Sequence, residues 1–131
     1  MSKNKIIIAS IVAAILVGSI TGCYKTTTLL VVAPEVTTEV SFSKDLTPLL
    51  TANCAKSGCH SGSVAPNLSA DNAYNSLVSG KLVDVANPES SEVYLWLTGK
   101  HSPAMPLGAT NNPSNINGIM LAWVKQGAKN N

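Results

Sequence analysis

The feature that most constrains this chain is a cluster of two cysteines and a histidine within seven residues, Cys54-Ala55-Lys56-Ser57-Gly58-Cys59-His60. Two thiols this close together can form a disulfide, and two thiols with an imidazole can bind one shared metal ion or prosthetic group. Three arrangements satisfy them: a disulfide between Cys54 and Cys59, a zinc site that also takes both histidines of the chain, or covalent attachment of a prosthetic group. The rest of the sequence has to decide among the three.

A haem with two vinyl groups binds covalently to such a cluster. Two cysteine sulfurs add to the vinyls as thioethers, and the histidine after the second cysteine then lies against the ring with a nitrogen toward the iron. The usual spacing leaves two residues between the cysteines, whereas four separate Cys54 from Cys59. Gly58 favours the longer loop, because glycine adopts positive φ at little cost. The cluster is therefore compatible with haem c bound through Cys54 and Cys59, with His60 as an axial ligand of the iron, but the cluster alone does not decide among the three arrangements.

The first 22 residues have the pattern of an export signal. Lys3 and Lys5 precede an uncharged run from Ile6 to Ile20, which is shorter than the roughly 20 residues that span a bilayer as a helix. The run ends in Ile20-Thr21-Gly22-Cys23, which resembles the lipobox of bacterial lipoproteins. The resemblance implies that residues 1–22 are removed and that Cys23 is lipidated. The alternative is an uncleaved membrane anchor with an incidental cysteine.

Removal of residues 1–22 would leave a chain without formal net charge. The nine basic residues are all lysines, two of them within the signal, so seven lysines would face seven acidic residues. A chain without arginine is a poor nucleic-acid binder, because arginine is the preferred partner of phosphates and base edges. Attachment to a membrane would depend on the lipid at Cys23. We expect a lipid-anchored protein of the cell envelope, and Tyr24 in place of an acidic residue favours the outer membrane facing the periplasm.

Residues 23–40 predict an extended tether. They are rich in β-branched residues, contain Pro34 and show no helical period. From Ser41 the pattern changes, because Phe42, Leu46, Leu49 and Leu50 form one helical stripe that Cys54 continues. We therefore place the folded domain at residues 41–131.

Four short helices are expected in this domain, so the predicted fold class is all-α. The first follows the cap at Ser41 or Ser43, and the second covers residues 71–78, with Tyr74, Leu77 and Val78 inward and Gly80 at its end. A third opens at Pro88 and ends at Gly99, and a fourth starts between residues 112 and 114 and ends at Gly127. Residues 101–108 hold two prolines and a glycine, which predicts a loop.

The core that these helices can form is small. About ninety residues carry only five large aromatic side chains: Phe42, Tyr74, Tyr94, Trp96 and Trp123. Domains of this size are marginally stable unless something else holds them together. A large apolar group is expected to complete the interior.

The order of these features resembles the small class I c-type cytochromes over about residues 41–128. Members of that family take a second axial ligand from a methionine in a proline-containing loop, and Met105 lies between Pro103 and Pro106, 45 residues after His60. The last helix, Ala122-Trp123-Val124-Lys125-Gln126-Gly127-Ala128, resembles the C-terminal "AWIxQGA" helix of the family. The resemblance implies a cytochrome c-like fold whose first and last helices cross, with one haem between them and the loops.

An iron held by both His60 and Met105 has no open position, so the resemblance implies an electron carrier rather than an enzyme, working with redox partner proteins. His101 is the alternative distal ligand, with Met105 then only filling space. A missing or labile Met105 would instead suit a haem sensor or gas binder. The competing function is a haem-free lipoprotein with a Cys54–Cys59 disulfide that binds a partner or envelope component.

Overall fold

The computed structural model describes residues 35–107 and 116–131. Every regular element within these ranges is helical, which confirms the all-α fold class. No helix in the described part of the chain is long and apolar enough to cross a membrane. The predicted signal, the lipidated Cys23 and the start of the last helix lie outside the described residues. The elements are η1 (Phe42–Leu46), α2 (Thr47–Asn53), α3 (Ala73–Val78), η2 (Pro88–Ser90), α4 (Glu92–Leu97) and α5 (Ile116–Lys125).

The predicted first helix is present as η1 followed directly by α2. Ser41 caps it: its Oγ accepts a hydrogen bond from the Lys44 amide, and its own amide donates to Asp45 Oδ2 at 2.8 Å. This reciprocal pairing satisfies two amides that the helix start would leave free. The first turn is a wider π turn, in which the backbone N–H of Thr47 donates to the carbonyl of Phe42. The sequence pattern does not predict that widening.

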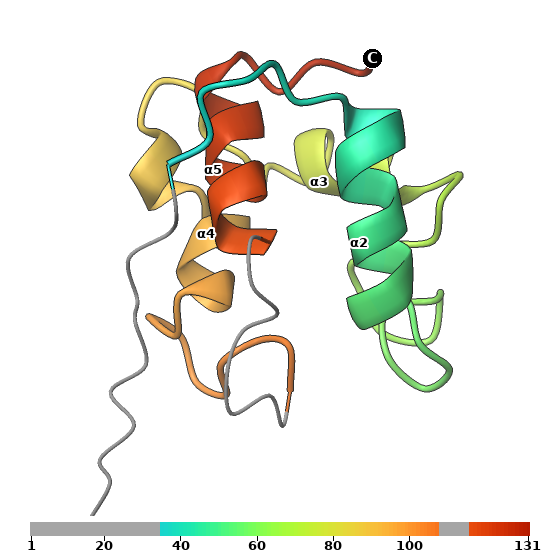
Figure 1. Cartoon of the computed structure of the whole chain (residues 1–131). Coiled ribbons are helices and arrows are strands. Elements are labelled where there is room, and N and C mark those ends of the chain that lie inside the picture. Colours follow the sequence, from blue (N-terminus) through green and yellow to red (C-terminus); the bar gives the residue numbers. More distant parts are fainter. Residues whose placement is uncertain (1–34, 108–115) are drawn as a thin grey trace, which may run out of the picture.

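The first and last helices of the domain meet through aromatic rings. The ring centroids of Phe42 and Trp123 are 5.1 Å apart, and Tyr74 contacts the edge of Phe42 with centroids 5.3 Å apart. Trp123 is fully buried, and its Nε1–H donates to the carbonyl of Lys129 at 2.8 Å. Such ring pairs stabilise a core beyond the area they bury. They hold α5 against η1, at the end of the molecule where the last residues also lie (Figure 1).

The second helix, α3, is shorter at its start than expected and differs at its end. Val78, which was expected to face inward, is 37% exposed. The left-handed residue after the helix is Lys81, with φ of 58°, and not Gly80. Gly80 is still required, because a Cβ at that position would overlap the carbonyl oxygen of Ser76.

The predicted single helix from Pro88 to Gly99 is wrong, because the chain forms η2 and α4 with a break at Ser91. Ser91 is buried with extended backbone, and its Oγ accepts from the Asp84 amide at 2.9 Å. A serine that bonds to a distant backbone group competes with helix continuation, which explains the break. Gly99 ends α4 as predicted, with φ of 70°.

The last residues assigned to the tether pack against the domain. Val40 is 4% exposed, and Val36 also packs against the core. The side-chain amide of Gln126 accepts from the Val40 amide at 2.8 Å and donates to the carbonyl of Thr38 at 2.9 Å. Ordered packing therefore begins several residues before Ser41, which was the predicted boundary.

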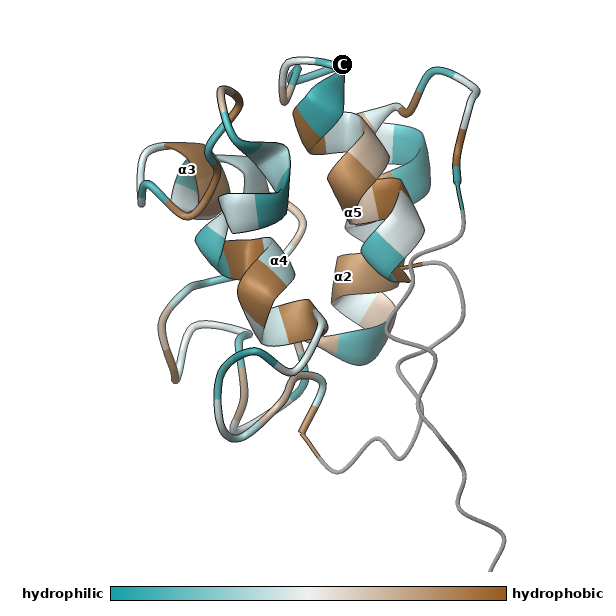
Figure 2. Cartoon of the chain, turned by 90° about the vertical axis from the view of Figure 1, so that its left-hand side faces the viewer, coloured by the Kyte–Doolittle hydropathy of each residue, from teal (hydrophilic) through white to brown (hydrophobic). Residues whose placement is uncertain are grey.

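Hydrophobic residues concentrate on the helices that enclose the interior. In Figure 2 the brown, hydrophobic stretches are most evident on α4 and α5, whereas the connecting loops are mostly teal or pale. The loop after α2 and the loop after α4 lie at the end of the molecule away from the C-terminal residues (Figure 1). These two loops carry the predicted site residues.

Candidate functional site

A cavity of about 490 Å³ opens between the loop after α2, the faces of α3 and α4, and the loop after α4. Its volume lies within the range of roughly 300–1,000 Å³ that small-molecule and cofactor sites occupy. The walls are mainly aliphatic, and Val64 and Leu107, which are 49% and 70% exposed, mark its opening to solvent. The deeper wall includes Leu50, Leu68, Leu77, Leu82 and Leu97.

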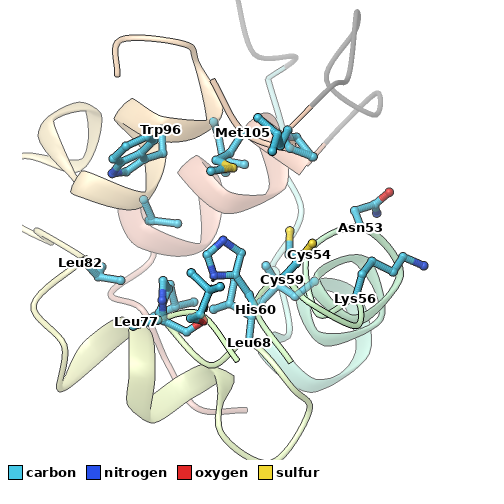
Figure 3. A pocket seen from close by; sticks show the side chains of 18 of the residues that line it. Asn53, Cys54, Lys56, Cys59, His60, Leu68, Leu77, Leu82, Trp96 and Met105 are labelled. Carbon is cyan, nitrogen blue, oxygen red and sulfur yellow. Dashed lines mark hydrogen bonds between the residues drawn. The ribbon is translucent and has the colours of Figure 1, made fainter. Parts of the chain in front are cut away.

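All four residues predicted to hold haem line this one cavity: Cys54, Cys59, His60 and Met105. Figure 3 shows the two cysteine sulfurs close together at one side and the ring of His60 projecting beside them. Met105 and Trp96 face them from across the space. The structure therefore brings together side chains that are up to 51 positions apart in the sequence.

The two cysteines differ in exposure. Cys54 ends α2 and is half-buried, whereas Cys59 is exposed, and both are free thiols. Burial, and to a lesser extent the neighbouring Cys59, raises the pKa of the Cys54 thiol above its ordinary value, so it is a neutral thiol at pH 7. The loop between them turns at Gly58, with φ of 78°, as the four-residue spacing predicted. It closes where the His60 amide donates to the carbonyl of Cys54 at 3.2 Å.

The ring of His60 is oriented by backbone carbonyls. Its Nδ1 lies 3.1 Å from the carbonyl oxygen of Pro66 and 3.3 Å from that of Val64. A carbonyl oxygen only accepts hydrogen bonds, so Nδ1 carries a proton, and in the neutral ring Nε2 is then the nitrogen with a free lone pair. Histidines that bind metals are usually held in this way, through the nitrogen that does not bind the metal. Backbone acceptors leave no signal in the sequence, so this support could not be predicted.

Met105 is positioned by the helix before it. Its amide donates to the carbonyl of Trp96 at 3.1 Å, which ties the loop back to α4. Its side chain is partly buried on the cavity wall. Met120, the other methionine of the described domain, is fully buried among core side chains, as its place on the helical stripe predicted.

His101 does not line the cavity. Its Nε2 lies 3.1 Å from a carboxylate oxygen of Glu92, and its ring centroid is 4.8 Å from that of Trp96. The described residues therefore put Met105 on the cavity wall and His101 outside it. Within residues 35–107 and 116–131, no group of three or more His, Cys, Asp or Glu side chains is placed to hold a metal ion, so the zinc alternative gains no geometric support.

Trp96 is one of the lining residues that were not assigned to the site from the sequence. Trp96 was interpreted as a core residue, but it is half-buried, and its indole forms part of the cavity wall. Trp96 follows Val93 by three residues, which is about one helical turn, so the sequence places it on the same inward face. Only the tertiary structure shows that the interior on that side is hollow.

The donor set fits a covalently bound haem. Two thiols lie beside an imidazole with a free Nε2, a thioether lies on the opposite wall, and the space between has aliphatic sides. No protein-family model, curated protein or solved structure matches this chain.

Proposed function

We propose that this protein is a lipid-anchored c-type cytochrome that transfers electrons through a single covalently bound haem. The observation that carries the proposal is the common cavity: Cys54, Cys59, His60 and Met105 line one apolar cavity although they come from two separate loops. A disulfide alone would require only the two cysteines. The hollow interior, the oriented imidazole and the facing methionine would then have no role.

Each residue has a distinct task in this proposal. Cys54 and Cys59 would add to the haem vinyl groups as thioethers, with each S–H hydrogen transferred to the vinyl carbon that does not bond sulfur. His60 would bind the iron through Nε2, since Nδ1 is engaged by Pro66, and Met105 would bind from the opposite wall. The haem would supply one-electron exchange between its ferric and ferrous states. The aliphatic walls disfavour the extra positive charge of the ferric state, and a methionine ligand acts in the same direction, so both raise the reduction potential.

Binding by both His60 and Met105 leaves no position for a substrate at the iron, which favours a carrier over an enzyme. Cys23, lipidated, would hold the protein at the membrane. The residues between Cys23 and the packed Val36 would form the tether. Such a tether raises the effective concentration of the domain near redox partners on the same membrane. A Cys23→Ser variant should remain unprocessed, and an intact Met1 terminus on the wild-type protein would contradict the lipoprotein assignment.

The decisive experiment is a visible absorption spectrum, with and without reductant, of protein made in a host that attaches haem c. We expect a spectrum that changes on reduction and a haem-stained band that survives a denaturing gel. Replacement of both cysteines by serine should abolish the stained band, and His60→Ala should abolish stable holoprotein. The Cys23→Ser variant is the matched control, because it also loses a thiol but should keep its haem. A colourless wild-type protein with a Cys54–Cys59 disulfide would favour the partner-binding lipoprotein instead.

A further inference from the structure

The side chain of His101 is held in a way that the proposed function does not explain. Its Nε2 is screened from solvent and lies 3.1 Å from Glu92 Oε1. The two atoms are within contact distance, but the contact is not aligned as a hydrogen bond. Its ring tilts by 44° against Trp96. Glu92 and Trp96 are one helical turn apart, so both contacts come from one face of α4.

The same helix also holds Met105. The Trp96 carbonyl accepts from the Met105 amide, and the Lys100 amide donates to the carbonyl of Leu95 at 2.9 Å. The loop also folds back on itself. Gly99 and Ala104 come so close that a Cβ on Gly99 would lie 3.5 Å from the Cβ of Ala104. His101 and Met105 are therefore two attachment points of one short loop on the end of α4.

We propose that His101 is a positioning residue for the iron ligand: clamped by Glu92 and Trp96, it holds the loop that presents Met105 and slows the release of the methionine from the iron. The inference rests on the proposed function and adds a role to it. If the clamp is lost, the segment that moves freely becomes longer. More of its conformations then place the Met105 sulfur away from the iron, which raises the entropic cost of keeping it bound.

The test is the rate at which cyanide binds to the oxidised holoprotein. Cyanide can bind the iron only after Met105 leaves, so the rate reports how often the loop opens. We expect His101→Ala to raise this rate about tenfold, the combined size of a half-exposed polar contact and a ring contact. The methionine–iron band of the resting spectrum should remain.

Glu92→Gln should raise the rate of cyanide binding about two- to threefold. The rate of the double variant should not exceed that of His101→Ala, because both changes remove the same clamp. Hydrogen exchange at the Met105 amide should accelerate in the same order.

Glu89→Gln is the matched control. It breaks the surface ion pair between Glu89 of the neighbouring η2 and Lys125, and this ion pair does not contact the loop. It should leave the cyanide rate unchanged. An unchanged rate in His101→Ala, with the band intact, overturns the positioning role and leaves the proposed function standing. Loss of the band in His101→Ala would also overturn it, because His101 would then be required for binding of Met105 to the iron at all, and not only for slowing its release. A wild-type protein without haem or without the band overturns the proposed ligand set instead.

Discussion

The two ends of this small domain are built in different ways. At one end Phe42, Tyr74 and Trp123 pack ring against ring, and Trp123 is fully buried with its N–H bonded. At the other end the aliphatic side chains of Leu50 and Leu77 are packed on one side and border a cavity of about 490 Å³ on the other. The first end is completed by its own side chains. The second has apolar walls that its own side chains do not fill, which is the arrangement expected around a large apolar cofactor.

The largest predicted effect concerns the cavity end without haem. Without haem the aliphatic walls of the cavity of about 490 Å³ stay in contact with water, and the burial of apolar surface that the cofactor would provide is lost. A whole domain is stabilised by only about 5–15 kcal/mol, so this loss weighs heavily on the cavity end. We predict that haem-free protein keeps some helix in far-ultraviolet circular dichroism but loses its near-ultraviolet signal.

The measurement is thermal unfolding, followed by circular dichroism, of a variant in which Cys54 and Cys59 are both serine, compared with the wild-type holoprotein. Residual protection from hydrogen exchange should be confined to amides near Trp123. A cooperative transition at the temperature of the holoprotein would show that the cavity end needs no cofactor, and the contrast between the two ends would lose its meaning.

A smaller effect is expected from weakening the aromatic end. Trp123→Ala in the holoprotein should lower the free energy of unfolding by about 3–5 kcal/mol, because it removes a fully buried ring. The haem spectrum of the folded fraction should not change, since Trp123 does not line the cavity. Denaturant unfolding measures the first quantity and absorption the second. Val85→Ala, at a position 49% exposed, is the control and should change stability by less than about 0.5 kcal/mol. A shifted haem spectrum in Trp123→Ala would mean that the two ends are coupled.

The opposite result is expected for a change at Met105, which should alter the haem spectrum. Met105→Ala should remove the methionine–iron band of the oxidised spectrum and open the iron to carbon monoxide or cyanide. It should also lower the reduction potential by on the order of 100 mV, within the roughly 0.8 V range that axial ligands span. A redox titration measures the shift. His101→Ala is the comparison, because His101 lies outside the cavity and should leave the band present. A Met105→Ala protein with an unchanged spectrum would exclude Met105 as the ligand.

The sequence predicts the aromatic end better than the cavity end, for a physical reason. Helical periodicity identifies Phe42, Leu46 and Trp123 as inward-facing, and the structure confirms that all three are buried. Periodicity cannot show whether an inward face meets another side chain or an open space, which is why Trp96 was assigned to the core. Cys54, Cys59 and His60 were predicted as site residues from their spacing and Met105 from the family resemblance, and the structure places all four around one cavity.

Features that depend on backbone groups or on single polar contacts were not predicted. The carbonyl of Pro66 that orients His60 has no side-chain signature, and the break at Ser91 depends on a hydroxyl that bonds to a residue seven positions earlier. The docking of Val36 and Val40 was missed because a short β-branched stretch without a period looks the same whether it is free or packed. In each case a tertiary contact overrides a local pattern.

The smallest predicted effect lies outside both ends, in the ion pair that joins η2 to α5. Glu89 Oε1 is 2.7 Å from Lys125 Nζ, and this hydrogen bond holds the pKa of Glu89 below its ordinary value. The folded protein therefore binds a proton at Glu89 less readily than the unfolded chain does. The stabilisation is present above the ordinary pKa of the carboxyl and is lost as the pH falls through the lowered value.

In Glu89→Gln the free energy of unfolding should therefore fall slightly less as the pH is lowered, as measured by denaturant unfolding across that pH range. Neither residue lines the cavity, so the haem spectrum at neutral pH should be identical in the variant, and any change in it would mean that the cavity end responds even to contacts that do not border it.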